Sequence, residues 1–199
     1  DVGSGTSSFE PTGAGGSEWR VTSPDGTRYA TPLDVRDLAT GDVLQTFQEC
    51  ALAPPLVWLP DGSVFGGGNV CVPGVAGEAA TLAGERFVVS DDRSTAVSAD
   101  GAGVGVLDLH AGTTGRLPVD DDVGCVAVSP DGTAILAHLP AAGPQGDDIF
   151  VVLARDGTEV DRFSAPSTVV ACESAHWRPG SQEVAIGTPD ELVVVEVRP

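Results

Sequence analysis

The sequence predicts an all-β protein, a five-bladed β-propeller whose blades are four-stranded antiparallel sheets. Three observations favour this fold. The 199 residues include 26 Gly and 15 Pro, which is typical of a chain with many turns. No long run of residues keeps the apolar period of an amphipathic helix. A turn phrase built on Pro-Asp-Gly recurs between apolar runs at intervals of about 30–50 residues, a spacing typical of propellers and solenoids.

Each turn phrase joins two short apolar runs. The phrase reads Ser-Pro-Asp-Gly at 23–26 and 129–132 and Leu-Pro-Asp-Gly at 59–62, whereas 90–93 and 178–181 depart from it. Pro sets the first corner of such a turn, and Asp-Gly supplies the tight return. A second hairpin follows in most units. Two hairpins make a four-stranded sheet, and radial repetition of such sheets is a propeller.

The repeats divide the chain into five predicted blades. Blade 2 has the least regular pattern, because its second half alternates little and Pro73 restricts any strand there. The predicted blades are 18–49, 54–85, 86–122, 123–165 and 172–198.

The two ends of the chain are predicted to meet in blade 5. This blade has only three strand-like runs before the sequence ends at Pro199, and the segment Thr-Ser-Ser-Phe-Glu-Pro at 6–11 precedes blade 1 without a partner. We therefore expect this N-terminal strand to close the last blade, since an open apolar edge invites aggregation. Residues 1–17 form a Gly/Ser-rich segment, and 18–199 form a single propeller domain.

The charge of the chain limits its partners. The formal net charge is −19, and all ten cationic residues are Arg, a usage that fits a bacterial protein with high-GC coding. Such an acidic chain repels nucleic acids and anionic lipid heads. The sequence has no Met and no apolar segment long enough to span a membrane. We expect a secreted or cell-surface protein that has either lost a leader by processing or been trimmed, and the sequence leaves a lipid anchor before Asp1 open.

The four cysteines predict disulfides. None lies in the Cys-x-x-Cys spacing of a zinc ribbon, and an even number in an exported chain favours two bridges. Cys50 and Cys71 bracket the first hairpin of blade 2, while Cys125 and Cys172 precede the inner hairpins of neighbouring blades. We predict the bridges Cys50–Cys71 and Cys125–Cys172. The alternative is four small buried thiols.

The Ser-Pro-Asp-Gly turns after an apolar strand resemble the repeats of TolB-type, WD40-like propellers. The resemblance covers most of the chain, is strongest at 23–26 and 129–132, and implies the fold. Functions in this group range from scaffolding of protein complexes to periplasmic interaction and domains attached to peptidases. No catalytic residue is implied, because none belongs to the repeat. Larger members usually have more blades, so five units make either a minimal ring or a partial ring completed by a partner chain.

Motifs for catalysis and for cofactor binding are missing from the sequence. It has no Gly-x-Ser-x-Gly elbow and no phosphate-binding loop, and we predict no catalytic residue, metal or cofactor. Two alternatives remain open. Histidines at a propeller axis can bind a metal, and His110, His138 and His176 lie in three different units, where the other interpretation is hydrogen-bonded strand or loop histidines. Calcium could occupy the acidic connections 90–92, 120–122 or 146–148, although none has the spacing of an EF-hand.

The leading functional prediction is a non-enzymatic module that binds a protein partner or itself. Loops on rigid scaffolds carry such contacts, and the connection 139–148 is among the longest irregular stretches. The alternatives are a metal-assisted hydrolase or lyase that uses the central channel, and a lectin-like carbohydrate binder, for which 5% aromatic residues is low. The candidate partner-binding residues are Pro140, Pro144, Gln145, Asp147 and Asp148.

Overall fold

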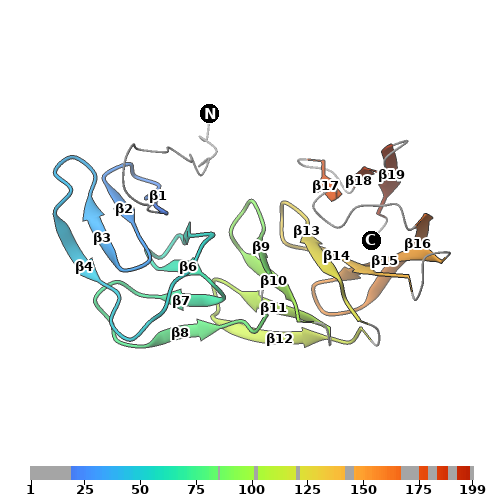
Figure 1. Cartoon of the computed structure of the whole chain (residues 1–199), viewed down its shortest axis with the longest axis horizontal. Helices are drawn as coiled ribbons and strands as arrows, with labels where there is room; N and C mark the ends of the chain where they lie inside the picture. The colour runs from blue at the N-terminus through green and yellow to red at the C-terminus, as the bar shows by residue number, and fades with distance from the viewer. Residues whose placement is uncertain are drawn as a thin grey trace. The chain divides into compact units, whose positions relative to one another are not determined.

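The structure, a computed structural model, consists of β-sheets wherever it describes the chain. The described residues are 19–84, 86–100, 103–119, 122–141, 146–166, 175–178, 183–187 and 192–197. Within these ranges there is no helix, and the strands form five antiparallel sheets, four of them four-stranded and one three-stranded (Figure 1). The prediction of an all-β protein with five blades is therefore confirmed.

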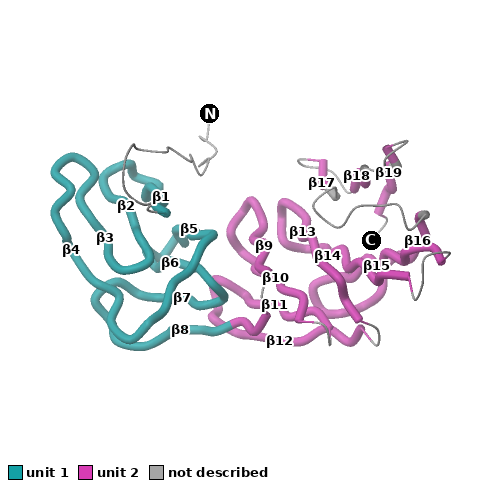
Figure 2. Tube along the Cα trace, viewed as in Figure 1, with its two compact units in different colours: residues 1–81 teal, residues 82–199 magenta. Residues whose placement is uncertain are grey.

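The chain divides into two compact units, 1–81 and 82–199 (Figure 2). The first unit contains two sheets, which correspond to predicted blades 1 and 2. Blade 1 consists of β1 (Val21–Thr22), β2 (Arg28–Ala30), β3 (Asp34–Asp37) and β4 (Val43–Thr46). Blade 2 consists of β5 (Val57–Trp58), β6 (Val64–Gly66), β7 (Asn69–Cys71) and β8 (Glu78–Thr81).

The second unit contains the other three sheets. Blade 3 consists of β9 (Arg86–Val89), β10 (Thr95–Ala99), β11 (Val104–Asp108) and β12 (Thr113–Leu117). Blade 4 consists of β13 (Cys125–Val128), β14 (Ala134–Leu139), β15 (Asp147–Ala154) and β16 (Glu159–Pro166). Blade 5 consists of β17 (Ala175–Trp177), β18 (Glu183–Gly187) and β19 (Leu192–Glu196). The expected closing strand at 6–11 lies outside the described residues, so closure stays a prediction, as does a single domain over 18–199.

The Asp-Gly turns are held by side chains of the phrase itself. In blade 1, Ser23 donates its hydroxyl hydrogen bond to Asp25 Oδ1 at 2.6 Å, and the same oxygen accepts from the backbone N–H of Thr27 at 3.0 Å. Gly26 then takes φ +69°, a left-handed conformation that favours glycine. The turn is therefore fixed locally, which explains why the sequence predicts it well.

The turn at 90–93, which departs from the phrase, keeps the same hydrogen bonds. In blade 3, Ser90 donates its hydroxyl to Asp92 at 2.7 Å, and Asp92 also accepts from the N–H of Ser94 at 2.9 Å. Arg93 occupies the position that Gly holds elsewhere and adopts φ +60°. The Ser and Asp side chains are thus sufficient to form the turn without Pro and Gly.

Blade 4 is buried on both of its faces. Val126 and Val128 pack in a core shared with blade 3, whereas Ala127, between them, packs in a core shared with blade 5. Neighbouring strand residues point to opposite faces of a sheet, so a strand covered on both sides is apolar at every position. This burial explains the continuous apolar runs at 125–128 and 134–137, the second of which ends at His138.

Polar contacts also join blades 3 and 4. The N–H of Asp92 donates to the carbonyl of Pro130 at 3.0 Å, and Arg155 forms an ion pair with Asp108 at 2.6 Å. The turn of one blade therefore serves as a hydrogen-bonding partner for the turn of the next.

Trp58 is the centre of the core in the first unit. Its ring is 1% exposed and packs with Ala30, Val35 and Val64. Its Nε1 donates to the carbonyl of Val21 at 2.8 Å, which satisfies the polar atom of a buried indole. Blades 1 and 2 are joined through this side chain.

Candidate partner-binding site

The connection 139–148 joins β14 and β15, the two central strands of blade 4. β14 and β15 pair from Ala134↔Ala154 to Leu139↔Ile149, so both ends of the connection are held by a regular ladder. In the structure Leu139 ends β14, and Asp147 and Asp148 begin β15. The described residues of the predicted connection that lie outside the strands are therefore 140, 141 and 146. A connection that is anchored on both sides by paired strands can present side chains in a fixed place.

A buried histidine and aspartate lie at the base of this connection. His138 Nε2 is 3.2 Å from Asp148 Oδ2, and the two residues are 7% and 5% exposed. Asp148 Oδ1 accepts a hydrogen bond from the N–H of Ala141 at 2.8 Å. One carboxylate therefore ties the outgoing strand, β14, to the first turn of the connection. We call this arrangement the His138–Asp148 clamp.

The imidazole of the clamp is itself held in place. It stacks on Phe150 with ring centroids 5.0 Å apart, and Phe150 stacks on Phe163 at 5.4 Å. On the other side, His138 Nδ1 lies 3.6 Å from Cys125 Sγ. Three strands of blade 4 thus fix the ring. The sequence allows His138 to be either an axial metal ligand or a hydrogen-bonded strand histidine. It does not indicate Asp148 as the neighbour of this histidine, because the strand register that brings the two together is not visible in the sequence.

The predicted partner-binding residues have different environments. Pro140 and Asp147 are exposed, whereas Asp148 is buried in the clamp. Pro144 and Gln145 lie outside the described residues. Asp148 therefore holds the connection from inside the blade. Among the described candidates, Pro140 and Asp147 are accessible to a partner.

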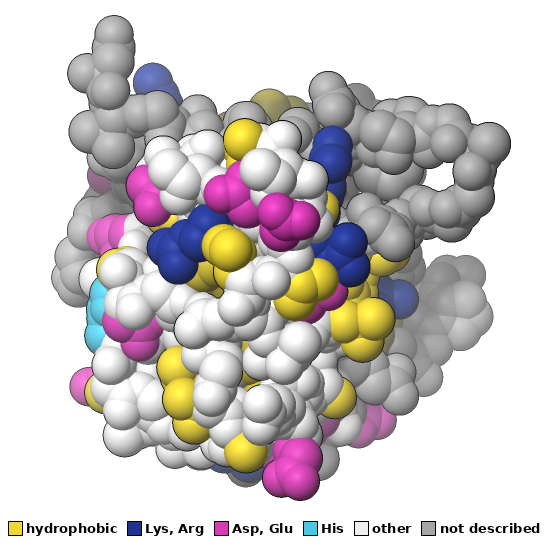
Figure 3. All heavy atoms as spheres, turned by 90° about the vertical axis from the view of Figure 1, so that its left-hand side faces the viewer, with side chains coloured by type: hydrophobic (Ala, Val, Ile, Leu, Met, Phe, Trp, Pro, Cys, Tyr) yellow, Lys and Arg dark blue, Asp and Glu magenta, His cyan; other side chains and the backbone are white. Residues whose placement is uncertain are grey.

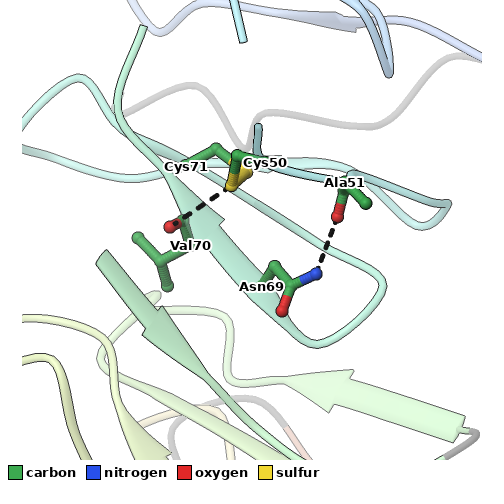
Figure 4. The surroundings of a disulfide bond; sticks show 5 residues. All are labelled: Cys50, Ala51, Asn69, Val70 and Cys71. Carbon is green, nitrogen blue, oxygen red and sulfur yellow. Dashed lines mark hydrogen bonds between the residues drawn. A yellow bond between two sulfur atoms is a disulfide. The ribbon is translucent and has the colours of Figure 1, made fainter. Parts of the chain in front are cut away.

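The disulfide between Cys50 and Cys71 fastens the connection between blades 1 and 2 to β7, the third strand of blade 2 (Figure 4). The Cα atoms are 5.9 Å apart, and Asn69 Nδ2 donates to the carbonyl of Ala51 at 2.8 Å nearby. No cysteine in the described part of the chain is a free thiol. Cys172 lies outside the described residues, so its bridge to Cys125 stays a prediction. A disulfide is compatible with an extracellular protein.

The residues considered for metal binding are spread over the structure. His110 is exposed in a turn of blade 3, His176 is exposed on β17, and His138 belongs to the clamp. Among the described residues, no group of three His, Cys, Asp or Glu side chains could hold a metal ion. Asp92 is engaged in its own turn. Asp120 and Asp121 lie outside the described residues.

Comparisons with known proteins give the fold. No family model matches the sequence, and no curated protein matches it. A crystal structure of a eukaryotic initiation factor matches with a TM-score of 0.61 at 14% identity, over 89% of this chain and 51% of that one. Hsv2 of Kluyveromyces lactis matches with a TM-score of 0.56 at 14% identity, over 90% of this chain and 58% of that one. A TolB-type protein of Agrobacterium tumefaciens is 19% identical, over 85% of this chain and 68% of that one, with a TM-score of 0.43.

The structural neighbours are β-propeller proteins, and this chain has the β-propeller fold. The chain spans slightly more than half the length of the initiation factor and of Hsv2. In the part of the chain that the structure describes, no helix is long and apolar enough to cross a membrane.

Proposed function

We propose that this chain is an exported, non-enzymatic propeller module that binds a partner protein at the cell surface or in an extracellular assembly. The observation that carries the proposal is the His138–Asp148 clamp, which fixes the base of the connection 139–148 while Pro140 and Asp147 remain exposed. A buried polar pair that fixes a single surface connection indicates that the conformation of this connection is important for function. The Cys50–Cys71 disulfide supports an oxidising compartment.

The proposal is tested by photo-cross-linking in the cells that produce the protein. A photoreactive amino acid replaces Asp147, and a matched variant carries it at Thr114, which is exposed on β12 of the neighbouring blade. We expect a defined cross-linked protein from position 147 that is absent at 114 and is competed away by purified chain. Equal products from both positions would contradict the proposed site.

A cofactor has no part in the proposed function. The surface carboxylates are proposed to keep the acidic chain soluble and to select a partner by charge. Titration with calcium in a calorimeter is expected to give no heat of binding. A saturable heat signal that disappears in the Asp147→Asn variant, but not in Asp42→Asn, would contradict this proposal and assign calcium to the connection.

A further inference from the structure

The outermost strand of blade 1 exposes apolar side chains. All four residues of β4 are exposed, and Val43 and Leu44 are 51% and 49% exposed. In the sheet order β1-β2-β3-β4, this strand is the edge. Figure 3 views the molecule from the side where β4 lies in Figure 1, and hydrophobic side chains are visible there between polar and charged ones.

Three more exposed apolar side chains adjoin β4. Leu33 is 75% exposed, and its carbonyl accepts from the N–H of Phe47 just beyond β4. Leu38 begins the turn that leads into β4, and Val75 follows Gly74, whose N–H donates to the carbonyl of Thr46 at 3.1 Å. Single exposed apolar residues are ordinary, but several around one strand mark an interaction surface. The β4 surface consists of Leu33, Leu38, Val43, Leu44 and Val75.

The C-terminal end of the β4 edge is already covered by the turn segment 74–77. Beyond β4, Gln48 and Ala76 form a parallel bridge, and the carbonyls of Thr46 and Gln48 accept from the N–H groups of Gly74 and Gly77. Nearer its start β4 has a bulge, because Val35 pairs with Gln45 and Arg36 with Val43, so Val43 and Leu44 do not follow the strict alternation of a regular strand. Within the described ranges, no strand pairs with β4 except β3. The edge therefore continues past the segment 74–77 at Val43 and Leu44.

Carboxylates stand at both ends of this edge. Asp42 precedes β4, Glu49 follows it, and both residues are exposed. The guanidinium of Arg36, near this edge, is already paired with the carboxylate of Asp34 through two hydrogen bonds, each of 2.9 Å. The chain as a whole carries −19. A second copy of the chain or any other acidic segment would be repelled, and a basic segment would be attracted.

We propose that the β4 surface binds an extended segment of a partner protein in which apolar and basic residues alternate. This inference rests on the proposed protein-binding function and names the chemistry of one partner. The segment adds to the uncovered part of the β4 edge through main-chain hydrogen bonds, its apolar side chains cover Val43 and Leu44, and its Lys or Arg residues lie near Asp42 and Glu49. Strand addition to an exposed edge is a common mode of peptide recognition.

The test uses two short synthetic peptides, one alternating valine and lysine and the other alternating valine and glutamate. Binding to the purified full chain is followed through the backbone amide signals of β4. We expect saturable binding of the lysine peptide that weakens as salt is added, with the largest shifts at Val43 and Leu44, and no binding of the glutamate peptide.

Three variants make the test specific. Leu44→Ser should weaken binding of the lysine peptide about tenfold, which corresponds to about 1.4 kcal/mol. Leu192→Ser is the matched control, because Leu192 is 65% exposed on the last described strand of blade 5, and it should bind like the unmodified chain. Asp42→Asn combined with Glu49→Gln should lower affinity and reduce the salt dependence without touching the apolar residues. If Leu44→Ser does not fold, this charge variant decides the question.

Several outcomes would overturn the inference. Equal binding of both peptides would contradict it, and so would unchanged binding of the lysine peptide by Leu44→Ser or by the charge variant. A dimer of the chain that Leu44→Ser abolishes would also contradict it, because the β4 surface would then bind a second copy. The cross-link at position 147 lies in a different blade. If the cross-link forms but the lysine peptide does not bind, only the inference about the β4 surface fails. If the peptide binds but no cross-link forms at position 147, the proposed site at 139–148 fails.

Discussion

Glycine serves two different purposes in the Asp-Gly turns. Gly26 and Gly132 have nearly the same φ, +69° and +68°, so each avoids the strain that a side chain meets in the left-handed region. Their surroundings differ. A Cβ on Gly26 would meet nothing within 4 Å, but one on Gly132 would lie 2.5 Å from Ser94 Oγ and 2.6 Å from Thr95 Oγ1. Gly132 is therefore also required for the approach of blade 4 to blade 3.

Alanine substitutions separate these two effects. Gly26→Ala should lower the free energy of unfolding by about 1 kcal/mol, the cost of a left-handed backbone. Gly132→Ala should lose about 1–3 kcal/mol more, because the added methyl group overpacks the turn. Gly115→Ala is the control, since a Cβ there would meet nothing within 4 Å and the φ is not positive. Urea unfolding measures all three. Equal losses at 26 and 132 would show that the contact with Ser94 and Thr95 is unimportant.

The turn aspartates make stability depend on pH. The hydroxyl of Ser23 and then the N–H and hydroxyl of Thr27 lower the pKa of Asp25 from 3.8 to about 2. A carboxyl whose pKa is lower in the folded state binds protons more weakly there than in the unfolded state. Its contribution is therefore complete above pH 3.8 and is lost as the pH falls toward 2.

Asp25→Asn should remove part of the acid sensitivity of the chain. The free energy of unfolding, measured by urea titration at several pH values, should fall less steeply between pH 4 and pH 2 in the variant than in the unmodified chain. Ser23→Ala should have a smaller effect in the same direction, because it removes one of the hydrogen bonds to Asp25. Parallel curves for all three proteins would contradict the role assigned to this turn.

At the scale of strands and connections, the sequence predicts an element well when the interactions that form it join residues close together in the chain. Turns with Ser and Asp at fixed spacing are predicted because their hydrogen bonds join residues two apart. Blade 2 is harder, since its last hairpin has little alternation. It forms a full sheet in which Gly67 and Gly68 make the tight turn between β6 and β7, and Pro73 lies in the next connection rather than in a strand.

The candidate site depends on contacts that no local pattern carries. His138 and Asp148 meet because β14 and β15 pair in one register, with the irregular connection between them. The sequence predicts that this connection exists and that it carries exposed acidic residues. It does not indicate which of Asp147 and Asp148 is exposed, because that depends on where the ladder ends.

Breaking the clamp should loosen the connection without unfolding the blade. Asp148→Ala removes the acceptor for the Ala141 N–H and the carboxylate that lies 3.2 Å from His138 Nε2. The free energy of unfolding should fall by about 1–3 kcal/mol, the usual cost of an unsatisfied buried polar group. Hydrogen exchange at Ala141 should accelerate more than at Leu136 in the middle of β14. Asp147→Ala, on the exposed neighbour, is the matched control and should change neither quantity.

The Cys50–Cys71 bridge should stabilise the first unit. It closes a loop with a sequence separation of 21 residues, and the replacement of both cysteines by alanine should cost about 2–4 kcal/mol through greater freedom of the unfolded chain. Urea unfolding without reductant compares the variant with the unmodified chain. If the two proteins unfold at the same urea concentration, the bridge does not stabilise the fold.

At the scale of the whole molecule, charge repulsion opposes folding. The chain carries −19 at pH 7 with only ten cationic residues, so most of its carboxylates have no cation to match. Repulsion among like charges is stronger in the compact state, and dissolved salt screens it. The exposed ion pairs, such as Arg162–Glu159 at 2.8 Å, are screened too, but each contributes only about 0–1 kcal/mol.

Added sodium chloride should therefore raise the thermal midpoint of the protein at pH 7. In a fold stabilised mainly by surface ion pairs, salt would lower the midpoint instead. The control is the same titration near the sequence pI of about 4.1, where the net charge vanishes and the stabilisation by salt should vanish with it. A midpoint at pH 7 that falls with salt would mean that the ion pairs outweigh the repulsion. Such a result would also weaken the argument that a basic segment, attracted by unmatched carboxylates, is the partner of the β4 surface.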